Sequence, residues 1–354
     1  MERGMKSDSA APTAAWARQR ERSNLTVLRM MRWLALVTGR RVSRLVLHGI
    51  VVWFLVGSPE LRRHSRAYLD RALGRKARWT DLFRHVFTFA ATLLDRVYLL
   101  QERFDDFEIE ASGVESVLGP VAEGKGALVC GAHMGSFEAL RMIGHGRGLR
   151  VAMIMYEGNA RLINDTLAKI APRTPLHTIA LGHVDAMLSL RRWLDDGGVA
   201  GLLADRSLQG PATHRSKTVV LPFLGAPARF PDGPFRLAAL LRRKIVFMAG
   251  LYRGGRRYEL RFEEIADFSS AEAIADRDAA IRSAVERYVR TLEALCREAP
   301  YNWFNFFDFW ADAGAEATAV GTGEAASAGR SNGGVGTAPI HPPSDRPMEQ
   351  RHVP

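Results

Sequence analysis

The chain has 354 residues, of which 47% are hydrophobic, and it carries a formal net charge of +11. This length leaves ample room for a hydrophobic core, and the composition excludes an intrinsically disordered protein. The chain has only two cysteines, Cys130 and Cys296, which excludes a disulfide framework or a cysteine-built metal site and fits a reducing compartment.

The positive charge is concentrated at the N-terminal end. Residues 1–80 contain 17 Lys and Arg against 5 Asp and Glu, whereas the rest of the chain is nearly neutral. Residues 1–24 are polar and mixed, and they predict a loose basic lead-in. Anionic lipid and nucleic acid both attract such a segment. Apolar residues between the basic clusters favour lipid, and no nucleic-acid-binding module is recognised.

The apolar run 45–56 is bracketed by arginines at positions 40, 41, 44, 62, 63 and 66. It falls short of the roughly 20 residues needed to span a bilayer. We expect an interfacial or partly embedded helix anchored by these arginines. A single marginal span and a buried helix of a soluble core are the alternatives. No small-residue cleavage site follows, which argues against a cleavable signal peptide.

The hydrophobic pattern changes near residue 105. Residues 25–104 repeat apolar side chains every three or four positions, which predicts a helical, membrane-associating region. After it, short apolar runs alternate with helical segments. The expected strands are 127–131, 149–155, 176–180 and 199–204, and the expected helices are the segment after the first strand, 162–170 and 186–194. The alternation predicts an α/β domain over 105–312, with a largely parallel central sheet flanked by helices, that packs with the helical region as one unit.

The C-terminal third has fewer periodic segments. Residues 219–225 and 230–235 are rich in proline and glycine and predict loops, followed by a helix to Arg243. A hairpin turn is expected at 253–256 between strands 245–251 and 258–262, and one long helix at 271–297. Residues 301–310 hold seven aromatic side chains, which suit either a core or a bilayer interface. The composition of 313–354 predicts a disordered tail.

One motif suggests catalysis. His133 and Glu138 lie five positions apart where the strand 127–131 runs into a predicted helix. They can converge if His133 occupies the turn and Glu138 the first helical turn, with Gly135 giving the turn flexibility and Ser136 as N-cap. An imidazole oriented by a carboxylate activates a hydroxyl nucleophile near neutral pH. Cys130 is also close, but we interpret it as a buried strand thiol.

A second polar pair, Asp205 and Arg206, directly follows the strand 199–204. Active sites of open α/β sheets gather at the carboxyl ends of the strands, so both clusters are expected at one sheet edge. A structural ion pair is the alternative for Asp205 and Arg206. The remaining histidines show no ligand spacing with carboxylates, so a metal site is not supported.

Residues 131–138 resemble the His-x4-Asp/Glu block of the bacterial lipid A late acyltransferases, within the lysophospholipid acyltransferase superfamily. Glu138 stands where many of these proteins have Asp. The resemblance covers roughly residues 16–310, and further similar blocks are 81–85, 94–96, 197–206, 223–227, 233–238 and 300–310.

The resemblance implies a mechanism. His133 would act as general base on an acceptor hydroxyl, and Glu138 would hold its imidazole. The hydroxyl would attack an acyl thioester directly, so no acyl-enzyme forms. Backbone N–H groups around Gly135–Phe137, at the N-terminus of the predicted helix, and Arg206 would stabilise the oxyanion. Asp205 would orient Arg206 or the acceptor.

The resemblance also implies substrates and partners. Asn159, Arg161 and Asn164 are candidate substrate contacts, with ordinary surface loop residues as the alternative. No bound cofactor is expected; the co-substrate would be the phosphopantetheine thioester of an acyl carrier protein, or acyl-CoA. The acceptor would be an amphiphilic glycolipid such as a lipid A precursor, and the protein would lie on anionic lipid at the cytoplasmic face of a bacterial inner membrane.

Other functions stay open from the sequence. The acceptor could be another glycolipid or an aryl-polyene-type lipid. The same base could activate water in a thioesterase or lipid hydrolase. A catalytically silent membrane-binding scaffold is the alternative outside the enzymes.

Overall fold

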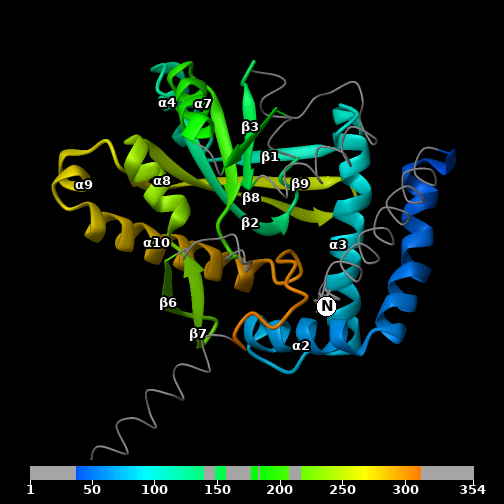
Figure 1. Ribbon diagram of the computed structural model, residues 1–354. Helices are drawn as coiled ribbons and strands as arrows, with labels where there is room; N and C mark the ends of the chain where they lie inside the picture. Colours follow the sequence, from blue (N-terminus) through cyan, green and yellow to red (C-terminus); the bar gives the residue numbers. More distant parts are fainter. Residues whose placement is uncertain (1–36, 139–147, 157–176, 182–183, 207–216, 312–354) are drawn as a thin grey trace, which may run out of the picture. The chain divides into compact units, whose positions relative to one another are not determined.

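The computed structural model describes residues 37–138, 148–156, 177–181, 184–206 and 217–311 (Figure 1). Several predicted segments lie outside these residues. They are the lead-in 1–24, the helix expected directly after the first strand, the helix 162–170 and the tail 313–354.

Three successive helices precede the sheet. They are Val37–Gly57, α2 (Pro59–Leu73) and α3 (Trp79–Leu99). Ser58 ends the first helix and caps the second, because its hydroxyl accepts from the Leu61 N–H and proline occupies the first position of α2. In the described part of the chain, no single helix is long and apolar enough to cross a membrane. The first two helices pass that test only as a pair, bent by 98° at Ser58.

A seven-stranded sheet forms the centre of the fold. Its order is β1-β9-β8-β2-β5-β3-β4, and all neighbours run parallel except β8 and β9. The strands are β1 (Glu108–Ser112), β2 (Ala127–Gly135), β3 (Val151–Tyr156), β4 (His177–Leu181), β5 (Val199–Leu203), β8 (Lys244–Gly254) and β9 (Arg257–Asp267). The predicted α/β fold with a largely parallel sheet is confirmed, as is the hairpin at 253–256.

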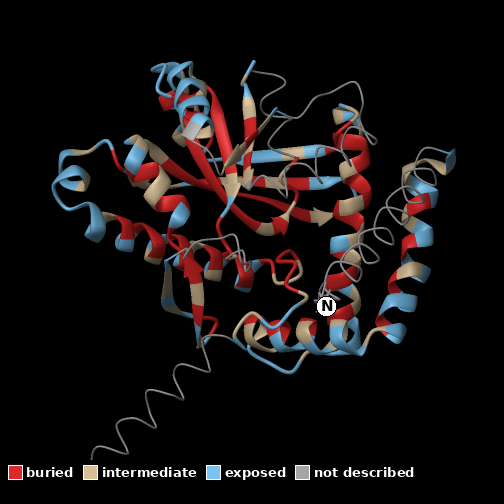
Figure 2. Ribbon diagram, in the orientation of Figure 1, coloured by how far each residue is buried: buried red, intermediate tan, exposed pale blue. Residues whose placement is uncertain are grey.

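Alternation along the strands places two cores on the two sheet faces. Leu128 and Cys130 pack on one side with α10 (Arg277–Glu298), whereas Ala127 and Val129 pack on the other with α4 (Glu115–Ala122). Figure 2 shows the strands and the facing side of α10 as buried. The remaining helices among the described residues are η1 (Phe104–Asp106), α7 (Val184–Asp195), α8 (Gly233–Leu241) and α9 (Ala271–Ala275).

Two segments differ from the sequence-based expectation. The residues predicted as loops form a separate two-stranded sheet, β6 (Thr218–Phe223) and β7 (Ala226–Pro231). Leu224 and Gly225 both have positive φ, as a two-residue type I′ hairpin turn requires. Prolines are tolerated there because both strands are edges. The predicted long helix divides into α9 and α10 at Asp276, whose side chain accepts from the Ala279 N–H.

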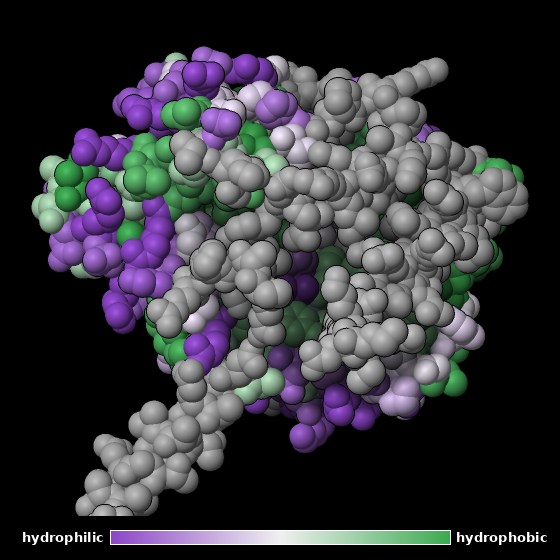
Figure 3. Space-filling view, viewed as in Figure 1, coloured by the Kyte–Doolittle hydropathy of each residue, from purple (hydrophilic) through white to green (hydrophobic). Residues whose placement is uncertain are grey.

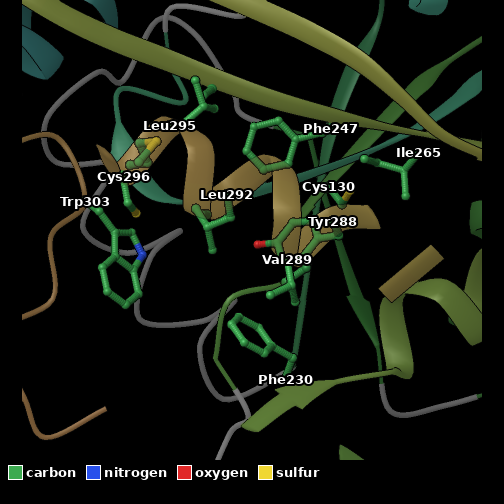
Figure 4. Packing of buried hydrophobic residues seen from close by; sticks show 14 of the residues in the cluster. Cys130, Phe230, Phe247, Ile265, Tyr288, Val289, Leu292, Leu295, Cys296 and Trp303 are labelled. Carbon is green, nitrogen blue, oxygen red and sulfur yellow. The ribbon is translucent and has the colours of Figure 1, made fainter. Parts of the chain in front are cut away.

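The aromatic segment near the end of the described chain belongs to the core. Trp303 is fully buried and packs edge-on against Tyr68, Phe223 and Phe309. Figure 4 shows it in one cluster with Cys296, Leu292 and Tyr288 of α10, with its indole nitrogen turned toward the middle of the cluster. Of the two roles that the sequence left open for this segment, the structure favours core packing at Trp303.

Candidate active site

His133 lies in strand β2 and not in the turn after it, contrary to the sequence-based prediction. The neighbouring strand β5 stops pairing at Gly131, but β2 gains a new partner. Gly135 N–H donates to Asn302 O (2.9 Å), and Phe304 N–H donates to His133 O (2.8 Å). This antiparallel pairing with a distant segment keeps the backbone extended through His133, and local sequence could not reveal it.

Glycine is required at position 135 because of the backbone conformation there and the close packing against β8. Its φ is +61°, and a Cβ atom there would lie 1.8 Å from the carbonyl oxygen of Gly250 in β8. The next N–H, of Ser136, donates to that same oxygen (2.8 Å). The N–H groups of both Gly135 and Ser136 are therefore occupied by carbonyl groups. They are not available to stabilise an oxyanion, which corrects the role that the resemblance implied for them.

The carboxylate that contacts the catalytic candidate is Asp205. His133 Nδ1 lies 2.8 Å from Asp205 Oδ1, and the His133 backbone N–H donates to Oδ2 (3.1 Å). Because an ionised carboxylate only accepts, Nδ1 carries the proton and Nε2 presents a lone pair. The His133 side chain is 38% exposed, whereas Asp205 is completely buried. The pair thus has the geometry of a general base that is oriented by a buried carboxylate.

The charge on Asp205 is maintained by its neighbours. Burial alone would raise the pKa of this carboxyl group, but the charge and hydrogen bonds of His133, together with Arg206, lower it to about 2. Trp303 also donates its indole N–H to Oδ2 (3.0 Å). Asp205 is therefore ionised at neutral pH without contact with solvent.

Arg206 borders the same site. Its Nη2 donates to Phe304 O (2.7 Å), its Nε lies 3.7 Å from Asp205 Oδ2, and its guanidinium group lies over the ring of Phe307. Burial lowers the pKa of this guanidinium. Since arginine remains charged in proteins, the site contains a fixed, partly desolvated cation beside His133.

Glu138 has a different partner from the one predicted. Its Oε1 lies 2.5 Å from Arg96 Nε in the last turn of α3, and its Oε2 accepts from the Ser136 hydroxyl (3.3 Å). Residues 137 and 138 form a turn after β2. The prediction that Glu138 holds the imidazole is therefore wrong in this structure, because the extended backbone at His133 brings the imidazole to Asp205. Ser136 directs its hydroxyl to Glu138, and the helix that it was expected to cap lies outside the described residues.

A comparison with protein families identifies the chain. Residues 81–310 match the family described as bacterial lipid A biosynthesis acyltransferase. The chain belongs to this family. A search of curated proteins finds no match. The matched region begins at α3 and extends through Trp303, so every residue of the site described above lies within it. Family membership makes the protein an acyltransferase of the lipid A type.

The structure does not describe the remaining predicted substrate contacts of this acyltransferase. Asn159, Arg161 and Asn164 lie outside the described residues. Among the residues that are described, no group of three or more His, Cys, Asp or Glu side chains is placed to hold a metal ion.

Sequence reasoning missed two residues of the acyltransferase site. Arg96 and Trp303 occur in the familial blocks 94–96 and 300–310, but nothing in their spacing relates them to His133. Both come to the site through tertiary contacts over long sequence separations. The sequence offered one general indication of such partners. A buried carboxylate needs a hydrogen-bonding or charged partner, so Glu138 and Asp205 would each need one if they were buried.

Proposed function

We propose that this acyltransferase moves a fatty acyl group from the thioester of an acyl carrier protein, or of coenzyme A, to a hydroxyl group of a membrane glycolipid similar to a lipid A precursor. The observation that carries the proposal is the contact between His133 and Asp205. It leaves Nε2 of an exposed imidazole as a hydrogen-bond acceptor at the sheet edge where Arg206 also lies.

The proposed reaction needs one base and no covalent enzyme intermediate. His133 Nε2 takes the proton of the acceptor hydroxyl as its oxygen attacks the thioester carbonyl carbon. The C–S bond then breaks, and the thiolate leaves with the proton from the imidazolium. Asp205 stabilises the positive charge that His133 carries between the two steps. No bound cofactor is required, because the thioester supplies the activated acyl group.

Arg206 is the proposed electrostatic partner of the oxyanion. It is held by Phe304 O and Asp205 without being fully enclosed, since 27% of its side chain is exposed. A fixed cation in a partly desolvated site stabilises developing negative charge more than one in water. In this proposal Glu138 acts at a distance from the imidazole, because its ion pair with Arg96 holds the turn after β2.

We propose membrane association through the Val37–Gly57 helix. Leu47, Val51 and Leu55 face the protein interior. The exposed side of the helix is also apolar, and it carries Val37, Val42, Leu45, Val46, Val52, Trp53, Phe54 and Val56. Hydrophobic residues along the right-hand edge of Figure 3 lie where this helix runs in Figure 1. An apolar helix face of this extent is typical of contact with lipid.

Exposed arginines near the ends of this apolar face suit an anionic surface. Arg41 precedes its centre, and Arg63 and Arg66 follow on α2. Each basic residue near an anionic membrane contributes about 1 kcal/mol of attraction. We therefore place the enzyme on the cytoplasmic face of a bacterial inner membrane, where acyl carrier protein or coenzyme A thioesters supply the donor.

The test uses full-length protein in vesicles that contain anionic phospholipid. Acyl transfer from labelled acyl carrier protein and acyl-CoA is measured with a lipid A precursor, other glycolipids and an aryl-polyene-type lipid as acceptors. We expect transfer to a glycolipid hydroxyl, with loss of turnover in His133→Ala and retention in the control His64→Ala. Full turnover in His133→Ala would overturn the mechanism. Acyl release to water without an acceptor would instead favour a thioesterase, and vesicle binding without any acyl chemistry a scaffold.

A further inference from the structure

The second oxygen of the Asp205 carboxylate has donors of its own. While Oδ1 faces His133 Nδ1, Oδ2 accepts from the His133 backbone N–H (3.1 Å) and from the indole N–H of Trp303 (3.0 Å). Two donors on one oxygen restrict rotation of the carboxylate group about its bond to the chain. The oxygen that remains is thereby directed to the imidazole.

The direction of the Trp303 N–H is set by packing. The indole ring is fully buried, and ring centroids of Tyr68, Phe309 and Phe223 lie 4.9, 5.0 and 5.4 Å away in edge-to-face arrangements. Aromatic side chains packed on this scale have little freedom to reorient. Trp303 therefore presents a donor to Asp205 from the core side, where water does not compete.

The backbone of Trp303 is held in register with His133. The hydrogen bonds from Gly135 N–H to Asn302 O and from Phe304 N–H to His133 O flank Trp303 on both sides. The Asn302 side chain also bonds both backbone groups of Tyr252 in β8, at 2.7 and 3.2 Å. A shift of the segment 302–304 would therefore break contacts with two strands.

His85 of α3 contacts the backbone carbonyl of Trp303, which also accepts from the Asn305 N–H (2.9 Å). Its Nε2 lies 2.8 Å from Trp303 O, and its Nδ1 lies 2.7 Å from the Ser65 hydroxyl in α2. Because a carbonyl oxygen only accepts, Nε2 carries the proton, and Nδ1 accepts from Ser65. Burial lowers the pKa of His85 to about 4, so the imidazole is neutral at physiological pH. The hydrogen bonds thus run from α2 through α3 to Trp303 and on to Asp205.

We propose that Trp303 and His85 are positioning residues for the acyl transfer: the Trp303 indole N–H holds the Asp205 carboxylate against His133, and His85 holds Trp303 in place. The inference rests on the proposed function, since it concerns the orientation of its general base. Neither residue touches the reacting atoms.

The decisive comparison is between Trp303→Phe and Trp310→Phe. Trp310 lies in the same aromatic cluster, but its indole N–H bonds the Phe223 carbonyl and not Asp205. In Trp303→Phe we expect kcat to fall about 10- to 100-fold, as a displaced catalytic group would cause, with KM for the acyl donor unchanged. Trp310→Phe should keep the kcat of the unmodified enzyme.

A second pair of variants covers the case in which Trp303→Phe does not fold. His85→Gln keeps a donor for Trp303 O, whereas His85→Leu removes it. We expect His85→Gln to retain most of kcat, and His85→Leu to lose kcat without a change in KM at temperatures where thermal unfolding shows it folded. The inference is overturned if a folded Trp303→Phe or a folded His85→Leu keeps the unmodified kcat.

Failure of this inference is distinguishable from failure of the proposed function. If the unmodified enzyme transfers acyl groups and His133→Ala does not, but Trp303→Phe matches the unmodified enzyme, only the positioning role is wrong. If the unmodified enzyme shows no transfer to any acceptor, the proposed function itself is wrong. The ionisable groups that face Asp205 are His133, Arg206, Tyr288 and Cys296. All four are unchanged in these variants, so a loss of kcat reports the hydrogen bond to Asp205.

Discussion

Arg96 and Glu138 join the last turn of α3 to the turn that follows β2, with Arg96 Nε 2.5 Å from Glu138 Oε1. The preceding residue of α3, Asp95, is buried and accepts from Arg40 of the Val37–Gly57 helix at 2.8 and 2.9 Å. Two successive side chains of α3 therefore hold the apolar N-terminal helix and the turn beyond His133. The helix that we propose to contact lipid is tied to the same element as the catalytic motif.

Asp205 and Glu138 have different partners, which predicts that they differ in their importance for catalysis by His133. Asp205→Asn should reduce kcat by about 10²- to 10⁴-fold, because an amide neither stabilises the imidazolium nor fixes the required tautomer. Glu138→Gln should cause a smaller loss, because Glu138 contacts Arg96 instead of His133. Steady-state kinetics on both variants checks this order. A larger loss in Glu138→Gln than in Asp205→Asn would contradict the assignment of Asp205 as the partner of His133.

His85 predicts a dependence of stability on pH. Its pKa is about 4 in the folded protein, because of burial, and about 6.5 when the chain is unfolded. Between these values the unfolded state binds the extra proton, so the free energy of unfolding falls as pH decreases from 6.5 to 4. The full loss is about 3 kcal/mol. Denaturant unfolding at several pH values should show this slope in the unmodified protein and a flatter one in His85→Gln.

Replacing Gly135 and Gly225 distinguishes two destabilising effects, the strain of a positive φ and a steric clash with the backbone. Both have positive φ, but only at Gly135 would a Cβ meet backbone, at 1.8 Å from Gly250 O; at Gly225 it would meet nothing within 4 Å. Gly225→Ala should cost about 1 kcal/mol from φ alone. Gly135→Ala should cost more than about 3 kcal/mol, since β2 and β8 must move apart. Equal unfolding midpoints for the two variants would contradict the close approach at the site.

The exposed face of the Val37–Gly57 helix predicts how the enzyme binds vesicles. Trp53 and Val56 are 69% and 68% exposed, so changing both to Glu should leave the fold intact. Binding to anionic vesicles should weaken at least about tenfold, because the apolar contact is lost and a like charge is added. Leu240→Glu on α8 is the control, since Leu240 is 62% exposed on a different element. Vesicle co-sedimentation measures the difference.

Much of the fold follows from periodicity. The strands β2, β3, β4 and β5 and the hairpin β8–β9 lie within a few residues of their predicted positions, because apolar runs and a glycine turn are local signals. The hairpin β6–β7 was not predicted, because its prolines are typical of loops and its pairing is visible only in three dimensions.

Three residues of the site could be predicted from the sequence, but the carboxylate that contacts the imidazole could not. His133, Asp205 and Arg206 were placed at one sheet edge from the strands they follow, and the structure brings them together. The imidazole contacts Asp205 and not Glu138 because the segment 302–304 pairs with the end of β2 and keeps its backbone extended through His133. This segment lies far from His133 along the chain. No local pattern near His133 carries that information.

Both thiols are buried, so the rate at which they react can be used to measure opening of the core. Cys130 and Cys296 are fully buried on the side of the sheet that faces α10, and burial raises the pKa of each. A thiolate there would form only after this core opens, so alkylating reagents should react at the rate of opening and not at the rate of a free cysteine. The modified fraction over time would then report how often the packing behind His133 and Trp303 loosens.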